Sequence, residues 1–374
     1  MKKAPISWLN LSIFLITGLI ALLLVPWYAF TVGFTLTEIV ATILCLGFCG
    51  MSITAGYHRL WSHKTYDAHP LVKFVLAIGG AFALQNSILH WSSDHRNHHK
   101  HVDNNDRDPY SAKRGFWHSH IGWMLREYQG DEYKNYNNCK DLQKDKIVVW
   151  QHKYYVPLAI ITNFGIPLAI GLITDRVIAC LLSIGVLRLV LSHHFTFFIN
   201  SLAHIWGKQT YTNAHTARDN AWLAFLTYGE GYHNFHHTFE YDYRNGIKWW
   251  HFDPTKWFIK SLSWLGLTHK LRTASEERIE QAKTKHKMQL MREHLTQHPH
   301  HHVLLEKLEA EYEILISRMS AFYTAKKQLI EFKKQKLEAD YRTSDIYLQF
   351  LELKQKLNEQ KQLFLKFNLT LQTA

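Results

Sequence analysis

Cysteine and proline are scarce in this chain, which has four Cys and eight Pro among 374 residues. Cys45, Cys49 and Cys180 lie in apolar runs and Cys139 stands alone in a polar stretch. This pattern indicates neither a disulfide framework nor a cysteine zinc site. The hydrophobic fraction of 47% excludes a disordered or collagen-like chain. The length allows about two domains with a sizeable core.

Acidic residues are fewer than basic ones: the chain has 31 Asp and Glu and 43 Lys and Arg, which gives a net charge of +12. A basic surface of this size suggests an anionic neighbour. Composition alone leaves nucleic acid, a phosphate-bearing substrate and acidic lipid open.

Charge is absent from residues 8–31, which are long enough to cross the roughly 30 Å hydrocarbon layer of a membrane. This run is too long for a signal peptide and lacks a small-residue cleavage site, so we interpret it as retained. Three more apolar runs predict spans over residues 34–57, 154–174 and 177–203. Gly33 and the pair Asp175-Arg176 provide the short turns of two helical hairpins.

A fifth apolar stretch, residues 71–89, has polar ends and predicts a peripheral helix that is amphipathic or partly inserted, and not a full crossing. Lys and Arg crowd the segments after the second and fourth spans, so the positive-inside rule places these segments and both termini in the cytoplasm. The sequence thus predicts an all-α membrane protein of four transmembrane helices in two hairpins, with a histidine-rich cytoplasmic cap. We expect membrane lipid, and no nucleic acid, as the neighbour of its basic surface.

The composition changes near residue 273 to Lys, Glu and Gln with leucines at helical spacing. We divide the chain there into a membrane domain, residues 1–272, and a helical tail, residues 273–374. An apolar seam typical of a coiled coil or a helical hairpin runs through Leu305, Leu308, Tyr312, Leu315, Met319 and Phe322. The tail is either a dimerisation or docking element, which would give a homodimer, or a solvated extension.

The 26 histidines are the unusual feature of the composition. They include three groups: His58 and His63 in HRLWSH, His95, His98 and His99 in HRNHH, and His233, His236 and His237 in HNFHH. The spacing i, i+3, i+4 in the last two places three imidazoles on one helix face. His58 and His63 point about 140° apart on an ideal helix. The first pair therefore requires the helix to end there and the chain to turn.

Eight neutral imidazoles exceed what one ion can bind, so two metals are implied. A carboxylate-bridged di-iron bundle would need paired Glu-x-x-His motifs, and only Glu230 to His233 matches. The zinc hydrolase motif H-E-x-x-H is missing as well. An all-nitrogen di-metal site at a membrane face favours a redox metal that works with dioxygen.

The chain at this point resembles the integral membrane fatty acyl desaturases, and within them the acyl-CoA delta-9 (stearoyl-CoA) branch. The resemblance covers residues 54–267 and rests on TAGYHRLWSHKTY, SDHRNHHK, RGFWHSHIGWML and GEGYHNFHHTFEYDYR. It implies two non-haem irons and dioxygen as co-substrate. It also implies a ninth ligand, His204 in NSLAH, and a metal-bound water held by Asn200; from the residues alone, His193 and His194 looked equally suitable.

The resemblance further implies a kinked acyl tunnel near Gln85, Thr196 and Phe197, where Phe197 replaces the usual tryptophan. Its closed end would be lined by Gly50 and Leu46, and the small Gly50 would let a long chain pass. Polar head-group contacts are implied for Asn86 and Asp94. Ser93 replaces an arginine of the family, and of the family's basic pair after GWML only Arg126 remains, at a shifted position. The group that carries the acyl chain is therefore left open as CoA, a lipid or acyl carrier protein. Lys113 and Arg114 would compensate by binding phosphate.

Electrons must come from a separate donor, because neither an H-P-x-G haem signature nor a glycine-rich dinucleotide motif is present. We expect a ferredoxin, a rubredoxin or a small cytochrome, fed by a reductase. These features favour a bacterial inner membrane over the endoplasmic reticulum. Two alternatives remain: a membrane lipid hydroxylase with the same metals, and a metal transporter, for which Glu38 and Arg188 are the conspicuous charges within the spans.

Overall fold

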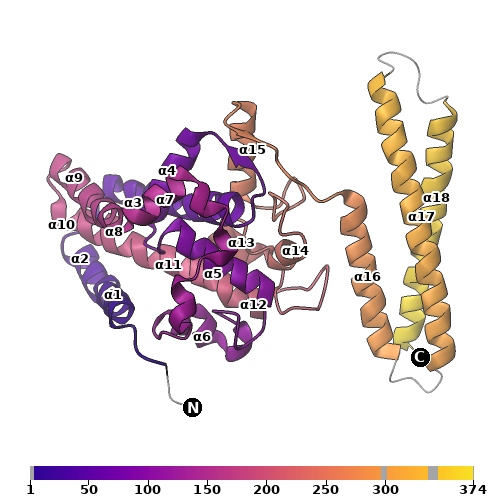
Figure 1. Ribbon diagram of the computed structural model, residues 1–374, viewed down its shortest axis with the longest axis horizontal. Helices are drawn as coiled ribbons and strands as arrows, with labels where there is room; N and C mark the ends of the chain where they lie inside the picture. Colours follow the sequence, from indigo (N-terminus) through magenta and orange to yellow (C-terminus); the bar gives the residue numbers. More distant parts are fainter. Residues whose placement is uncertain (1–3, 296–300, 336–343, 374) are drawn as a thin grey trace. The chain divides into compact units, whose positions relative to one another are not determined.

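The computed structural model describes residues 4–295, 301–335 and 344–373 (Figure 1). The chain folds as two compact units. The first comprises Met1–Gln209 and Ala214–Thr273, and the second comprises Thr210–Asn213 and Ala274–Ala374.

Four helices among the described residues are long and apolar enough to cross a membrane: Trp8–Thr31, Leu36–Ser62, Tyr155–Ile173 and Val177–Ile205. The shortest has 19 residues, which corresponds to about 28 Å and is close to the thickness of the hydrocarbon layer. The predicted all-α membrane protein with four spans is therefore confirmed. The second span extends five residues beyond the predicted end, because its last turns are polar but still helical.

Each span combines α-helical and π-helical stretches. In chain order these are α1 (Trp8–Leu19), η1 (Ile20–Leu24) and α2 (Val25–Thr31); α3 (Leu36–Met51) and η2 (Ser52–Ser62); α8 (Tyr155–Ile160), η8 (Ile161–Gly165) and α9 (Ile166–Ile173); α10 (Val177–Cys180), η9 (Leu181–Leu187), α11 (Arg188–Asn200) and α12 (Leu202–Ile205).

The fifth apolar stretch forms α4 (Pro70–Phe82), which has 13 residues and is too short to cross. Its inner face packs against η2, whereas Leu71, Phe74 and Val75 are exposed. The helix ends at Phe82, seven residues before the predicted end. Its placement at the membrane surface stays a prediction.

The rest of the first unit consists of short elements. These are β1 (Asp67–Ala68), α5 (Ile88–His101), α6 (Phe116–His120), α7 (Lys146–Lys153), α13 (Ala221–Leu226), α14 (His233–Thr238), α15 (Pro254–Trp264) and β2 (Thr268–His269), with single 3-10 turns at Ala112–Arg114, Gly122–Met124, Gly130–Lys134, Asn137–Cys139 and Leu142–Lys144. The two strands pair antiparallel. One apolar core joins Ile53 of η2, Leu76 of α4, Ile88 of α5, Ile184 of η9 and Ile259 of α15.

The charges within the spans serve the packing of the helices. Glu38 accepts a hydrogen bond from Arg176 Nε at 2.5 Å, which ties the second span to the turn between the third and fourth. Arg188 is buried, donates to Phe82 O at 2.7 Å and to Asn163 Oδ1 at 2.8 Å, and stacks over the Phe82 ring. Glu38 and Arg188, the two charges singled out for the transporter alternative, are thus both paired within the protein.

The second unit contains α16 (Glu276–Leu295), α17 (His301–Gln335) and α18 (Asp345–Thr373), with α17 and α18 side by side (Figure 1). The predicted seam of α17 packs inward through Leu308, Leu315 and Met319. Its neighbours in that core are Met291 and Leu295 of α16 and Leu357 and Phe364 of α18.

Candidate metal centre

Nine histidine side chains converge as two groups in the first unit. The first group is His58, His63, His95, His99 and His236, and the second is His98, His204, His233 and His237. Within each group the nearest ligand nitrogens all lie within 4.8 Å of one another. These are the nine histidines that the sequence and the resemblance single out, and their division between two sites is new information from the structure.

The π-helical winding of η2 explains the first histidine pair. In a π-helix the hydrogen bonds run from residue i+5 to residue i, and His63 N donates to His58 O at 3.1 Å. The two imidazole rings lie 4.9 Å apart. The helix ends at Ser62, between the two histidines, as expected, and the wider turn of η2 brings their rings together.

The other two histidine groups each contribute to both sites. On α5, His95 and His99 reach the first site and His98 the second; on α14, His236 reaches the first site and His233 and His237 the second. Residues at i and i+4 share one helix face, whereas the residue beside them points elsewhere. The two helices thus hold the two sites next to each other.

The spacing of the Nε2 atoms fits metal coordination. Six Nε2 pairs lie 2.8–3.3 Å apart: His58–His236, His63–His95, His99–His236, His98–His237, His204–His233 and His233–His237. Imidazoles bound to one ion at about 2.1 Å and about 90° to each other place their nitrogens about 3 Å apart. A single proton can bridge two imidazole nitrogens, but not four or five that converge. The residues present therefore fit one cation in each group.

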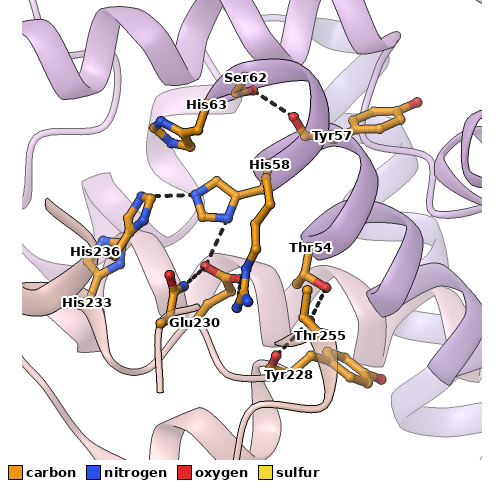
Figure 2. A network of polar contacts seen from close by, with 12 residues as sticks. Thr54, Tyr57, His58, Ser62, His63, Tyr228, Glu230, His233, His236 and Thr255 are labelled. Atoms are coloured by element: carbon orange, nitrogen blue, oxygen red, sulfur yellow. Dashed lines mark hydrogen bonds and ion pairs between the residues drawn. The ribbon is translucent and has the colours of Figure 1, made fainter. Parts of the chain in front are cut away.

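In five of these histidines the opposite ring nitrogen, Nδ1, contacts another side chain. His58 Nδ1 lies 2.9 Å from Glu230 Oε2, His98 Nδ1 2.8 Å from Asp108 Oδ1, and His99 Nδ1 3.1 Å from Glu240 Oε2. His95 Nδ1 meets the Tyr110 hydroxyl at 3.1 Å, and His204 Nδ1 meets the Thr216 hydroxyl at 2.8 Å. A carboxylate that accepts the Nδ1 proton fixes the tautomer and leaves Nε2 free to bind metal. Figure 2 shows His58 between Glu230 and His236.

Glu230 belongs to a buried charge network. Arg59 donates to Glu230 Oε1 at 2.9 Å and contacts Asp253 Oδ1 at 3.0 Å, and all three side chains are buried. Asn245 donates to Glu230 Oε2 at 2.6 Å. Burial by itself raises the pKa of Glu230, but the neighbouring His58 and Arg59 outweigh burial and hold this pKa below its ordinary value. Sequence reasoning noticed Glu230 only as half of a Glu-x-x-His motif, and it missed Asp108 and Glu240.

Six of the ligand imidazoles have lowered pKa values and are neutral at neutral pH. Burial away from water is the main cause, and the neighbouring imidazoles add to it. The pKa of His99 falls to about 4, and the pKa values of His63, His95, His233, His236 and His237 fall well below 6.5. A neutral imidazole is the form that binds a metal.

The competing histidines of the fourth span lie outside both groups. His193 Nε2 contacts the carbonyls of Ala83 and Leu84, and His194 Nδ1 contacts His120 Nε2 at 3.0 Å. His215 is a neighbour that sequence reasoning missed, with its ring 5.1 Å from that of His237. It follows an irregular segment, so no helical spacing could have revealed it.

The residues expected at a tunnel kink are neighbours in the structure. Gln85 Nε2 donates to Thr196 Oγ1 at 2.8 Å, and Phe197 is buried one residue later. Asn86 N donates to the Tyr155 hydroxyl at 2.8 Å, and Asp94 lies 3.4 Å from His90 Nε2. Their predicted substrate contacts stay predictions.

The remaining predicted substrate residues are dispersed. Arg126 donates a hydrogen bond to Ala4 O at 2.7 Å. Arg114 stacks over the Tyr128 ring, and Lys113 beside it is exposed. Asn200, which is predicted to hold a metal-bound water, is the last residue of α11. Gly50 does not leave an open space: a Cβ there would overlap the Tyr228 ring, whose hydroxyl donates to Leu46 O at 3.2 Å. The room that glycine provides is thus taken by a tyrosine.

Comparison with known proteins agrees with this geometry. The fatty acid desaturase family profile matches residues 35–263. The chain is 38% identical over 287 residues to a probable acyl-CoA desaturase of Schizosaccharomyces pombe, covering 76% of this chain and 59% of that protein. It is 40% identical over 281 residues to acyl-CoA desaturase 1 of Saccharomyces cerevisiae, covering 74% and 54%.

A third relative has a different named substrate. The sn-2 palmitoyl-lipid 9-desaturase of Nostoc sp. is 35% identical over 274 residues, which cover 72% of this chain and 92% of that protein. The chain thus spans little more than half the length of the two yeast relatives and nearly all of this one. Together the histidine sites, the four apolar helices and these matches show that the chain is an integral membrane protein of the fatty acid desaturase family.

Proposed function

We propose that this protein is an O2-dependent fatty acyl desaturase that introduces a cis double bond, at the delta-9 position, into a long acyl chain. The observation that carries the proposal is the pair of all-histidine sites at the ends of the second and fourth spans. The names of the relatives support the reaction and its position on the chain.

The metals we propose are two non-haem irons. Imidazole suits iron, copper, zinc and nickel, and removal of hydrogen from an unactivated methylene requires a redox metal. Iron held at these sites would supply the oxidising power of dioxygen, which acid and base side chains lack.

The residues of the chain would bind the metals, orient the acyl chain and shield the site from water. Nine imidazoles would hold the metals, and Glu230, Asp108 and Glu240 fix the ring orientations through Nδ1. Gln85 and Thr196 would position the acyl chain, and Phe197 would form its wall. Burial of the site excludes water from the reacting carbon atoms.

The reaction needs electrons from outside the chain. Loss of two hydrogens from neighbouring carbons gives the double bond, and together with dioxygen, two electrons and two protons it yields two waters. We propose a ferredoxin, a rubredoxin or a small cytochrome with a reductase as the donor.

Acyl-CoA is the substrate we propose first, in line with the names of the yeast relatives. An acyl chain on a membrane lipid is the second candidate, favoured by the near-complete match to the Nostoc protein and by Ser93 in place of an arginine. We place the histidine sites and both termini in the cytoplasm, and we propose a bacterial inner membrane.

The fatty-acid profile of cells that express the chain tests the proposal, in a host without an aerobic desaturase of its own. Gas chromatography with double-bond location should detect a new cis monoene. A hydroxylated fatty acid would instead assign the protein to the lipid hydroxylases. An unchanged profile, from protein with two irons per chain and supplied with ferredoxin and reductase, would contradict the proposal.

A further inference from the structure

Large aromatic side chains point outward from two short helices of the first unit. On α13, Trp222 is 79% exposed and Phe225 63% exposed, while Leu223 between them is buried. On α15, Trp257 and Trp264 are 44% and 76% exposed, whereas the opposite face is buried in the core through Ile259. We call Trp222, Phe225, Trp257 and Trp264 the aromatic face.

Ring contacts connect the two helices beside this face. The Phe225 ring lies 4.9 Å from that of Phe252, which in turn lies 5.5 Å from that of Trp257. Trp257, Lys260 and Trp264 follow each other at helical spacing on the exposed side of α15. Tryptophans with a lysine on one face are typical of elements that lie at a membrane surface.

Hydrogen bonds fix the height of this surface along the second span. The Tyr228 hydroxyl, two residues after α13, donates to Leu46 O at 3.2 Å. Thr255, at the start of α15, shares a 2.7 Å hydrogen bond with Thr54 and donates to Tyr228 O. Counted from Leu36, Leu46 lies about 15 Å and Thr54 about 27 Å along the helix, and the hydrocarbon layer is about 30 Å thick.

We propose that the aromatic face is immersed in the bilayer, at the boundary between lipid head groups and acyl chains on the side of the histidine sites. The partner is the phospholipid surface that surrounds the protein's own spans. The contact with Thr54 places the start of α15 near the end of the hydrocarbon layer, and the Tyr228 side chain reaches Leu46 deeper in that layer. Four exposed aromatic rings would be unfavourable in water. Because His233 follows only seven residues after Leu226, this anchor would hold the histidines of α14, His233, His236 and His237, close to the membrane.

Spin labels on the full-length chain test the proposal. Trp222→Cys, Phe225→Cys and Trp264→Cys would each be labelled in a Cys45→Ala background, since Cys49, Cys139 and Cys180 are buried. Each variant is reconstituted at one chain per phosphatidylcholine nanodisc. Leu22→Cys, 71% exposed in the first span, is the lipid control, and Lys100→Cys, exposed on α5, is the water control.

Power saturation compares collisions with oxygen, which concentrates in lipid, and with a water-soluble nickel chelate. We expect the oxygen-to-nickel ratio of the three labels to lie several-fold above that of Lys100→Cys and to approach that of Leu22→Cys. Ratios equal to that of Lys100→Cys would overturn the proposal. Protection from both reagents would also overturn it, because protein would then cover the face. Three labels are used so that misfolding of one variant, detected by loss of bound metal, leaves the test intact.

Discussion

At the scale of the residue, the decisive atoms are the ring nitrogens that face away from the metals. In the first site the carboxylate on His58 is Glu230, and in the second site the carboxylate on His98 is Asp108. Each carboxylate is buried and touches a ligand of one site. The two sites can therefore be weakened separately.

Glu230→Gln and Asp108→Asn form a matched pair. Loss of such a partner costs roughly 10- to 100-fold in metal affinity. We expect Glu230→Gln to lower iron affinity at the first site and Asp108→Asn at the second, each with one metal retained. Competition with a chelator, followed as stepwise metal release, measures both. Equal loss from the two sites in either variant would contradict this assignment.

His98→Ala should remove a ligand from a site that has four. We expect loss of one of two metals per chain and loss of desaturation by more than about 100-fold, since the reaction requires both. His101→Ala on the same helix is the control, because His101 belongs to neither group. Mass spectrometry measures the metal content of both variants, and gas chromatography measures the desaturated product that each one forms. A His98→Ala variant with two metals and full activity would exclude this ligand.

The sequence predicted the ligands better than their arrangement. Spacing identified eight histidines, and the resemblance added His204. The division into groups of five and four depends on the π-helical winding of η2 and on how α5 faces α14, neither of which a one-dimensional pattern encodes. Asp108 and Glu240 were missed because their partners are ring nitrogens that only the fold brings near.

At the scale of the element, α3 shows how one residue type can have two roles. A Cβ at Gly50 would overlap the Tyr228 ring, whereas a Cβ at Gly47, one turn earlier, would meet nothing within 4 Å.

The apolar runs predicted all four spans, because length and hydropathy are properties of the run itself. The end of the second span at Ser62 was missed, since polar residues there are stabilised by contacts with the cap.

Gly50→Ala should destabilise the protein by about 1–3 kcal/mol through overpacking. Gly47→Ala should change stability little, and Gly50→Ala combined with Tyr228→Leu should recover most of the loss. Thermal unfolding in detergent compares the three variants. If Gly50→Ala and Gly47→Ala behave alike, the Tyr228 ring does not occupy this space.

At the scale of the whole molecule, buried neutral histidines make stability depend on pH. Burial lowers the pKa values of His99, His118, His120 and His215 to about 4, against 6.5 ordinarily. Between these values the unfolded chain binds protons that the folded chain does not. The free energy of unfolding therefore falls as the pH drops from about 6.5 toward 4.

Metal-free protein should accordingly melt at a lower temperature at pH 5 than at pH 7.5. Intrinsic fluorescence during heating measures the difference. In a variant with His118→Gln and His120→Gln the dependence should be shallower, because two of the groups are gone. A melting temperature that rises at pH 5 would show that other groups control the stability.

The two carboxylates of the first site differ in their access to solvent. Glu230 is buried, whereas the Glu240 side chain, 3.1 Å from His99 and 4.0 Å from His63, is 55% exposed. Dissolved ions screen exposed charges over about 8 Å at physiological ionic strength, and they screen buried charges much less. A cation held by the first site would be attracted by both carboxylates, and added salt should weaken its attraction to Glu240 more than its attraction to Glu230. The ionic strength of the buffer would thus tune one metal from outside the protein.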